Sequence, residues 1–458
     1  MTNPTIMKRI LLTITSLMFV LSLSAQTTFE RSYDFYNSAF SDLVFSQEDG
    51  YLMAMAGLKD KYYLSLVKTD LNGDTLWTKD YDRGIDYITD LYGTNDEQGN
   101  IYIACNDFAH ENLLKLDMDG NILWAKNYTT LKLEMIVKNN VLWICGNASP
   151  LGNYLFKIDA LTGDSLWRSN VFNVDNISGA SSHATSIAVT ENNEVVVTVS
   201  LANSFEPFLE QTQFFKLLPG ANDLVEFSLD ITNPFVVSDT KNLGNELISI
   251  ANHPGYSLPN VTYLIRYTSD GTLLAFKEEI FGYYTAILYK CVITDENQVV
   301  AMGDASGGGQ PGQVMLHAFS MSGDSLWTQL PGNYEQTGWD FKITGDNGFI
   351  ITGGEEFPTN YKPFLIKTNS LGEINAIPEM VGLTLKAYPN PATGNVTFEI
   401  PGIRSGKIII YNSIGAACCK LKIAGEKTVW DCNNYQPGIY AYSVISDGSF
   451  VSGKIVVK

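Results

Sequence analysis

Residues 89–127 read TDLYGTNDEQGNIYIACNDFAHENLLKLDMDGNILWAKN. The stretch holds four short runs rich in apolar residues, at 89–94, 101–106, 112–117 and 122–127. The first pair of runs and the last pair are each joined by a short segment of Asp, Asn and Gly, the residues that tolerate the positive φ of tight hairpin turns. The stretch therefore predicts four antiparallel strands connected in sequence order.

The same arrangement recurs along the chain. A Gly-Asp/Asn-x-Leu-Trp motif ends at Trp77, Trp124, Trp167 and Trp327, with 47 and 43 residues between the first three. A turn followed by a mostly apolar run occurs seven times, starting at Asp49, Gly99, Asn139, Asn192, Gly244, Glu296 and Asp346. Repeats of this length are typical of propeller blades. Four strands repeated seven times predict an all-β, seven-bladed β-propeller, in which each Trp packs between blades.

A ring of blades also needs a closing strand. The sequence FERSYD at 29–34 echoes WTKDYD at 77–82, which is the outer strand of the first repeat. The seventh repeat, by contrast, ends weakly near Ile374, before Pro378. We therefore expect residues 28–36 to supply or extend the outer strand of the last blade, so that the propeller spans residues 27–377 and leaves no open sheet edge.

The first residues have the form of a secretory signal peptide. Lys8 and Arg9 precede an uncharged apolar run from Ile10 to Ala25, and Ala25 followed by Gln26 fits a cleavage point. The run is shorter than the roughly 20 apolar residues of a comfortable membrane span, and no later segment offers another. We predict that residues 1–25 are a signal peptide and that no membrane span remains after its removal.

The last seventy-odd residues carry a different set of motifs. They contain Tyr388-Pro389-Asn390-Pro391, a strand opening at Gly438-Ile439-Tyr440, and a terminal KIVVK from Lys454 to Lys458. In this order the motifs resemble the type A C-terminal sorting domain of the type IX secretion system of Bacteroidetes, over residues 383–458. The resemblance implies a small β-sandwich, recognition by the secretion machinery, and passage through the periplasm and across the outer membrane to the cell surface or the medium. Residues 378–382 are then the expected linker.

Motifs for catalysis are scarce. The four histidines show no metal-ligand spacing, and the sequence holds neither a Gly-x-Ser-x-Gly elbow nor a phosphate-binding Gly-rich loop. No catalytic residue and no organic cofactor is predicted. In the tail, Cys432 is a candidate disulfide partner of Cys418 or Cys419, because an exported protein can oxidise its thiols.

Three aspartates form a sharper candidate site. The first strand of each blade lines the central channel of a propeller, and counting back from the apolar runs places Asp42, Asp90 and Asp340 near one channel mouth. Three carboxylates there could bind a divalent cation such as Ca²⁺, or serve as acid and base on a sugar. Alternatively, a repeated Asp simply caps the turn that enters each strand, a pattern the repeat generates without any function.

The loops between second and third strands give a second indication of a working face. They are longer in blades four to seven and carry the aromatic residues Phe205, Phe208, Tyr256, Phe357 and Tyr361. Such residues could form a rim that binds glycan or protein, or they could fold inward and cover the blade tops.

Two function classes remain open. A formal net charge of −19 without a basic patch argues against nucleic acid as a partner. The absence of a compact catalytic motif favours a secreted or cell-surface, non-catalytic binding propeller with a glycan or protein ligand. The alternative is a carbohydrate-active propeller, a glycosidase or lyase that uses the channel carboxylates. A propeller fold alone does not decide between them, because the fold hosts both.

Overall fold

The regular structure of the described residues consists of β-strands. The computed structural model describes residues 27–35, 38–82, 88, 90–106, 111–128, 131–148, 152–170, 172, 180–203, 210–253, 261–283, 285–307, 310–357, 360–374, 386–399, 406–412, 417–423, 425, 427–446 and 449–458. The chain divides into two compact units, Met1–Asn375 and Ala376–Lys458. The predicted signal peptide (1–25) and linker (378–382) lie outside the described residues.

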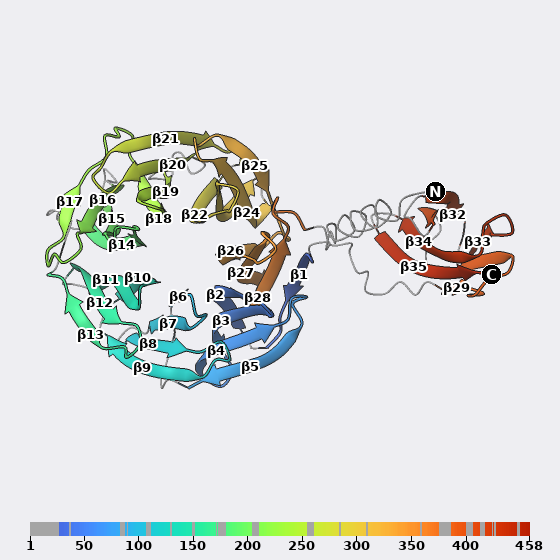
Figure 1. Cartoon of the computed structure of the whole chain (residues 1–458), viewed down its shortest axis with the longest axis horizontal. Helices are drawn as coiled ribbons and strands as arrows, with labels where there is room; N and C mark the ends of the chain where they lie inside the picture. Colours follow the sequence, from blue (N-terminus) through green and yellow to red (C-terminus); the bar gives the residue numbers. More distant parts are fainter. Residues whose placement is uncertain are drawn as a thin grey trace, which may run out of the picture. The chain divides into compact units, whose positions relative to one another are not determined.

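The first unit contains seven four-stranded antiparallel sheets. Figure 1 shows these sheets around one central axis, with the first strand of each sheet innermost. The first three blades are, from inside to outside, β2 (Ser38–Gln47), β3 (Gly50–Leu58), β4 (Tyr62–Thr69), β5 (Thr75–Tyr81); β6 (Asp90–Asn95), β7 (Ile101–Asn106), β8 (Glu111–Leu116), β9 (Ile122–Tyr128); and β10 (Leu131–Lys138), β11 (Val141–Ala148), β12 (Gly152–Asp159), β13 (Ser165–Arg168).

The remaining blades repeat this order. They are β14 (Ala180–Val189), β15 (Val195–Asn203), β16 (Glu210–Leu217), β17 (Val225–Phe227); β18 (Val236–Leu243), β19 (Glu246–Asn252), β20 (Val261–Thr268), β21 (Leu273–Ile280); β22 (Thr285–Ile293), β23 (Gln298–Gly307), β24 (Gln310–Ser320), β25 (Ser325–Gln329); and β26 (Gln336–Ile343), β27 (Phe349–Phe357), β28 (Asn360–Thr368), β1 (Phe29–Ser32). The all-β, seven-bladed propeller predicted from the repeats is confirmed.

The seventh blade takes its outer strand from the other end of the propeller sequence. Strand β1 pairs antiparallel with β28, with Phe29 opposite Lys367 and Ser32 opposite Phe364. The rings of Phe29 and Tyr33 are buried, and the Tyr33 hydroxyl donates to the carbonyl of Gly73 in blade one at 2.7 Å. The first described residues therefore hold blade seven and blade one together.

Neighbouring blades pack through the repeated Trp. The indole of Trp77 lies against Gly120 in blade two, that of Trp124 against Gly163 in blade three, and that of Trp327 against Gly372 in blade seven. A β-carbon at Gly163 would lie 2.8 Å from the Trp124 ring, and all three glycines have positive φ. The repeat thus needs glycine both for the turn and for the close approach of the indole.

The second unit is a two-sheet sandwich. Its strands are β29 (Lys386–Tyr388), β30 (Asn395–Glu399), β31 (Gly406–Tyr411), β32 (Ala417–Ile423), β33 (Lys427–Asp431), β34 (Gly438–Ser446) and β35 (Ser449–Val457). One sheet has the order β29-β30-β33 and the other β32-β31-β34-β35. Phe398 and Trp430 of the first sheet share one core with Ile408 and Tyr442 of the second. The predicted small β-sandwich is confirmed.

Candidate functional sites

The tail motifs, distant in sequence, meet at the end of the sandwich. The amide of Asn390 donates to the carbonyl of Lys454 at 2.9 Å, and its oxygen accepts from the backbone N–H of Val456 at 2.9 Å. The backbone N–H of Lys458 donates to the carbonyl of Ala392 at 2.8 Å. The segment that holds Pro389 and Pro391 is therefore fastened along β35, beside the C-terminus.

The other motif residues frame the same sheet. Gly438 opens β34 and lies opposite Val457, and the buried Tyr440 donates its hydroxyl hydrogen bond to the carbonyl of Gln436 at 2.8 Å. Tyr388 is exposed and donates to Glu399 at 2.9 Å. The cysteines Cys418, Cys419 and Cys432 carry free thiols, so the possible disulfide is not formed in this structure.

The three candidate metal ligands occupy different positions on their strands. In β26 a bulge lies between Gly338 and Asp340, and in β2 the same bulge lies between Ser41 and Leu43. Asp42 is therefore the bulged residue, equivalent to Trp339, whereas Leu43 is the equivalent of Asp340. In β6 the residue equivalent to Asp340 is Tyr92. Asp90 lies two residue pairs farther from the hairpin turn.

Lysines surround Asp340. Its carboxylate is 1% exposed, lies 2.7 Å from Lys342 Nζ and 3.7 Å from Lys290 Nζ, and accepts the backbone N–H of Val44 at 3.1 Å. Burial alone would raise the pKa of Asp340, but the two ammonium groups outweigh it and the pKa lies below its ordinary value. Within the described residues, no three His, Cys, Asp or Glu side chains are arranged to hold a metal ion. The Ca²⁺ site at Asp42, Asp90 and Asp340 remains a prediction, and these contacts do not support it.

The position of Asp340 joins consecutive blades. The equivalent residue of blade five, Asp239, accepts the backbone N–H of Cys291 in blade six at 2.9 Å. That of blade four, Ser186, accepts the backbone N–H of Thr240 in blade five at 2.7 Å. Asp340 does the same from blade seven to blade one. In blades four, five and seven this position therefore fastens one inner strand to the next, which is a structural role.

Blade three holds an acid at the same position. Glu134 lies opposite Cys145. Its carboxylate interacts electrostatically with the charged groups of Lys290, Asp239, Lys241 and Asp340. Burial raises the pKa of Glu134 to about 7, although the positive charge of Lys290 acts to lower it. In blades five to seven this position holds Asp239, Lys290 and Asp340 in turn, and the charges of these acids and lysines offset one another.

The histidines and the aromatic loops add no site in the described residues. His317 is fully buried between Phe281 and Phe319, and its Nδ1 lies 2.8 Å from the hydroxyl of Thr328. Burial lowers the pKa of His317 to about 4, so this imidazole is neutral. Of the predicted aromatic rim, Phe205, Phe208 and Tyr256 lie outside the described residues, and Tyr361 is 43% exposed.

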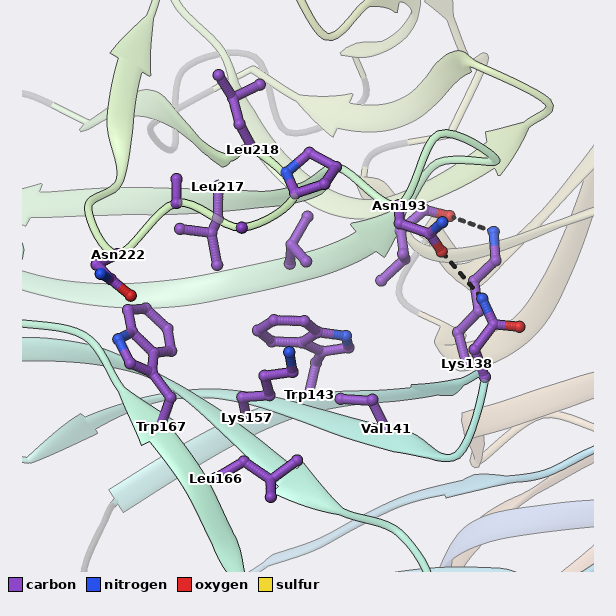
Figure 2. A pocket seen from close by; sticks show the side chains of 16 residues that line it. Lys138, Val141, Trp143, Lys157, Leu166, Trp167, Asn193, Leu217, Leu218 and Asn222 are labelled. Carbon is purple, nitrogen blue, oxygen red and sulfur yellow. Dashed lines mark hydrogen bonds between the residues drawn. The ribbon is translucent and has the colours of Figure 1, made fainter.

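A pocket of about 560 Å³ opens where blade three meets blade four. Figure 2 shows Trp143, Trp167 and Lys157 of blade three on one wall, facing Leu217, Leu218 and Asn222 of blade four. The turns 139–140, 190–194 and 218–224 surround it, so it lies on the face opposite the loops between second and third strands. The sequence did not predict this site.

The pocket exists because one packing contact of the repeat is missing. At six blade junctions a side chain of the preceding outer strand lies within 4 Å of a β-carbon placed on the turn glycine: Phe29–Gly73, Trp77–Gly120, Trp124–Gly163, Phe227–Gly271, Lys277–Gly323 and Trp327–Gly372. At the junction of blades three and four no such contact lies within 4 Å of a β-carbon placed on Gly220, which stands five residues before Val225, whereas Gly73 stands four before Trp77. The pairing of β16 with β17 stops at Lys216 and Val225, so that residues 218–224 are unpaired. Trp167 borders the open space beside this turn.

A second contact is missing in the same blade. Lys68, Lys115 and Lys157 lie directly opposite Trp77, Trp124 and Trp167, respectively. Lys68 pairs with Asp49 at 2.6 Å and Lys115 with Asp96 at 3.6 Å, in each case an Asp of the inner hairpin. Blade three has Asn139 and Asn140 in that hairpin, and Lys157 forms no ion pair within the described residues. Its Nζ lies instead 5.5 Å from the centre of the Trp143 ring.

We expect the two outer-strand tryptophans to differ in their contribution to stability. Trp124→Ala removes an indole that packs on Gly163 and donates to the carbonyl of Ala160 at 3.3 Å, and should lower the free energy of unfolding by about 2 kcal/mol or more. Trp167→Ala should cost at least about 1 kcal/mol less, because the indole borders the pocket. Denaturant unfolding of both variants measures the difference, and equal losses would contradict the packing argument.

The two units define the protein as a β-propeller joined to a small β-sandwich, and sequence comparison identifies the sandwich. Residues 386–458 match the family described as secretion system C-terminal sorting domain. The C-terminal unit is such a domain, and the chain is a propeller protein exported by the type IX system to the cell surface or the extracellular space. In the described part of the chain, no helix has the length and hydrophobicity to cross a membrane.

Comparison with solved structures gives matches at low sequence identity. The Dos1 propeller is 14% identical, with 74% of this chain and 84% of that chain covered and a TM-score of 0.44. BamB from Moraxella catarrhalis is 12% identical, with coverages of 93% and 98% and a TM-score of 0.38. A protein of unknown function from Dyadobacter fermentans is 12% identical, with coverages of 74% and 99% and a TM-score of 0.42. No curated protein matches the sequence.

Proposed function

We propose that this exported propeller is a non-catalytic binding protein, and that its ligand site is the pocket between blades three and four. One observation carries the proposal: the contact between outer strand and turn glycine that closes six junctions is absent at this junction, where the pocket opens beside Trp167. Ligand pockets combine apolar and aromatic walls with a few polar groups, and this one has two indoles, leucines and three asparagines.

The carbohydrate-active alternative has less support. It requires carboxylates that are free to act as acid and base on a sugar. Asp340, one of the acids on which that hypothesis depends, is almost fully buried, accepts a backbone N–H and is paired with Lys342. Its contacts match those of Asp239 in blade five, so the repeated structural role explains it without catalysis.

Affinity electrophoresis with a reducing-sugar assay tests the proposal. The purified protein is run through gels that contain pectate, alginate, hyaluronan, xylan or starch, and each polysaccharide is assayed for new reducing ends. We expect retardation in at least one gel without new reducing ends. Trp167→Ala should abolish the retardation, and Trp327→Phe, at a closed junction, should retain it. New reducing ends, retardation that persists in Trp167→Ala, or no retardation in any gel would contradict the proposal.

A further inference from the structure

We infer that the pocket between blades three and four binds an acidic sugar, a uronate or sialate unit of an extracellular glycan. The inference rests on the proposed binding function and adds the chemical class of the ligand.

The pocket wall has a charge opposite to that of the chain. The chain carries a formal net charge of −19, yet the sixteen described residues that line the pocket include Lys138 and Lys157 and no Asp or Glu. The Nζ of Lys138 donates to the carbonyls of Thr190 at 2.8 Å and Val189 at 3.3 Å, so this lysine is held in place by blade four. An anion would be favoured here and repelled by most of the remaining surface.

Among the described residues of the pocket wall, Lys157 is the cation that can pair with an anionic ligand. In blades one and two the equivalent lysines are buried and neutralised by an Asp of the inner hairpin. In blade three Asn replaces that Asp, and Lys157 is half-buried at the pocket wall. A carboxylate of the ligand would take the place that the hairpin Asp takes in the other blades, and a hydrogen bond between charged groups is stronger than one between neutral groups.

The rest of the wall suits a sugar ring. Trp143 and Trp167 offer flat apolar faces, which can pack on the C–H face of a pyranose. The amides of Asn139, Asn193 and Asn222 can each donate and accept, as hydroxyl groups require. Asn139 donates to the side-chain oxygen of Asn193 at 2.9 Å, which links the hairpins of the two blades at the pocket edge. An aliphatic or aromatic anion would leave these amides without partners.

Titration with defined oligosaccharides tests the inference. Tri-galacturonate, its fully methyl-esterified form, a hyaluronan tetrasaccharide, sialyllactose and the peptide Ala-Leu-Phe are added to the purified protein, and tryptophan fluorescence and calorimetry are recorded at 20 and 200 mM NaCl. We expect at least one acidic sugar to bind, and more weakly at the higher salt concentration. If this sugar is tri-galacturonate, its ester should bind at least about tenfold more weakly.

The variants separate the charge from the pocket. Lys157→Gln should weaken binding of the acidic sugar about tenfold, while Lys216→Gln should leave it unchanged. Lys216 is the matched control because it has the equivalent place in blade four, lies 5.8 Å from the Phe227 ring, and does not line the pocket. Trp167→Ala should abolish binding of the acidic sugar, whatever its identity.

Four results would overturn the inference. These are tri-galacturonate that binds no more tightly than its ester, binding of the peptide in preference to every acidic sugar, an acidic sugar that binds Lys157→Gln as tightly as the wild type, and failure of all three acidic sugars to bind. In each case the binding function itself stands if the gels still show retardation that depends on Trp167, and it fails with the inference if they do not.

Discussion

Deletion of residues 27–36 should lower the thermal midpoint of the propeller by roughly 10 °C. The deletion removes the outer strand of blade seven together with the buried rings of Phe29 and Tyr33, each worth about 2–3 kcal/mol. It also removes the ion pair of Arg31 with Asp74 of blade one at 3.2 Å and exposes the edge of β28. Differential scanning calorimetry of the shortened protein gives the midpoint.

Truncation at the other end of the chain is the matched control. Removal of residues 376–458 deletes the sorting domain, which is a separate compact unit, and should leave the propeller transition within about 2 °C of its original midpoint. A propeller whose midpoint is insensitive to loss of residues 27–36 would show that β1 does not close the ring.

Replacement of Asp340 by Asn should lower the free energy of unfolding by about 3 kcal/mol. The substitution leaves the half-buried ammonium group of Lys342, which lies 2.7 Å from the carboxylate, without its counter-charge, and weakens the hydrogen bond that joins the buried Asp340 side chain to the Val44 N–H. Urea unfolding of the variant and the wild type, each with and without calcium, gives the values.

The control for this prediction is an exposed carboxylate. Asp164 lies 2.7 Å from Lys126 but is 65% exposed at its side chain, so Asp164→Asn should cost less than about 1 kcal/mol. We expect the loss in Asp340→Asn to be the same with and without calcium. A loss seen only when calcium is present would support the metal site. No loss under either condition would contradict the structural role of Asp340.

The repeat made the architecture predictable. In blade two the expected runs 89–94, 101–106, 112–117 and 122–127 differ from β6, β7, β8 and β9 by at most one residue at either end. Turn chemistry fixed these limits, because Gly99 and Gly120 between the runs adopt the positive φ of tight turns. Seven copies of one pattern left little freedom in the number of blades.

The inner strands show why the metal candidates were misaligned. Counting residues back from the apolar run assumes that every hairpin turn has the same length. Two residues separate Gln47 from its partner Gly50, whereas three separate Thr344 from Gly348, so equal counts reach Asp42 and Asp340 although Leu43 holds the equivalent position. A difference of one residue between turns leaves no reliable mark in a single sequence, and the role of Asp340 depends on a backbone N–H of another blade.

The pocket was not predicted from the sequence for a different reason. It results from a contact that is missing between two blades, and a sequence pattern shows which residues are present but not which pairs fail to meet. Two signals were available all the same. The turn glycine of blade four, Gly220, stands one position earlier than its counterparts do relative to the outer strand, and Asn139 and Asn140 stand where other blades have an acid that pairs with the repeated lysine.

The stoichiometry of binding tests the central claim most directly. Because the repeat contact is missing at one junction of the described ring, oligosaccharides of the retained polysaccharide should bind with one site per chain in isothermal titration calorimetry. The Trp167→Ala variant should show no binding, and the titrated solution should contain no new reducing ends. Several equivalent sites per chain, or one site that survives Trp167→Ala, would contradict the account.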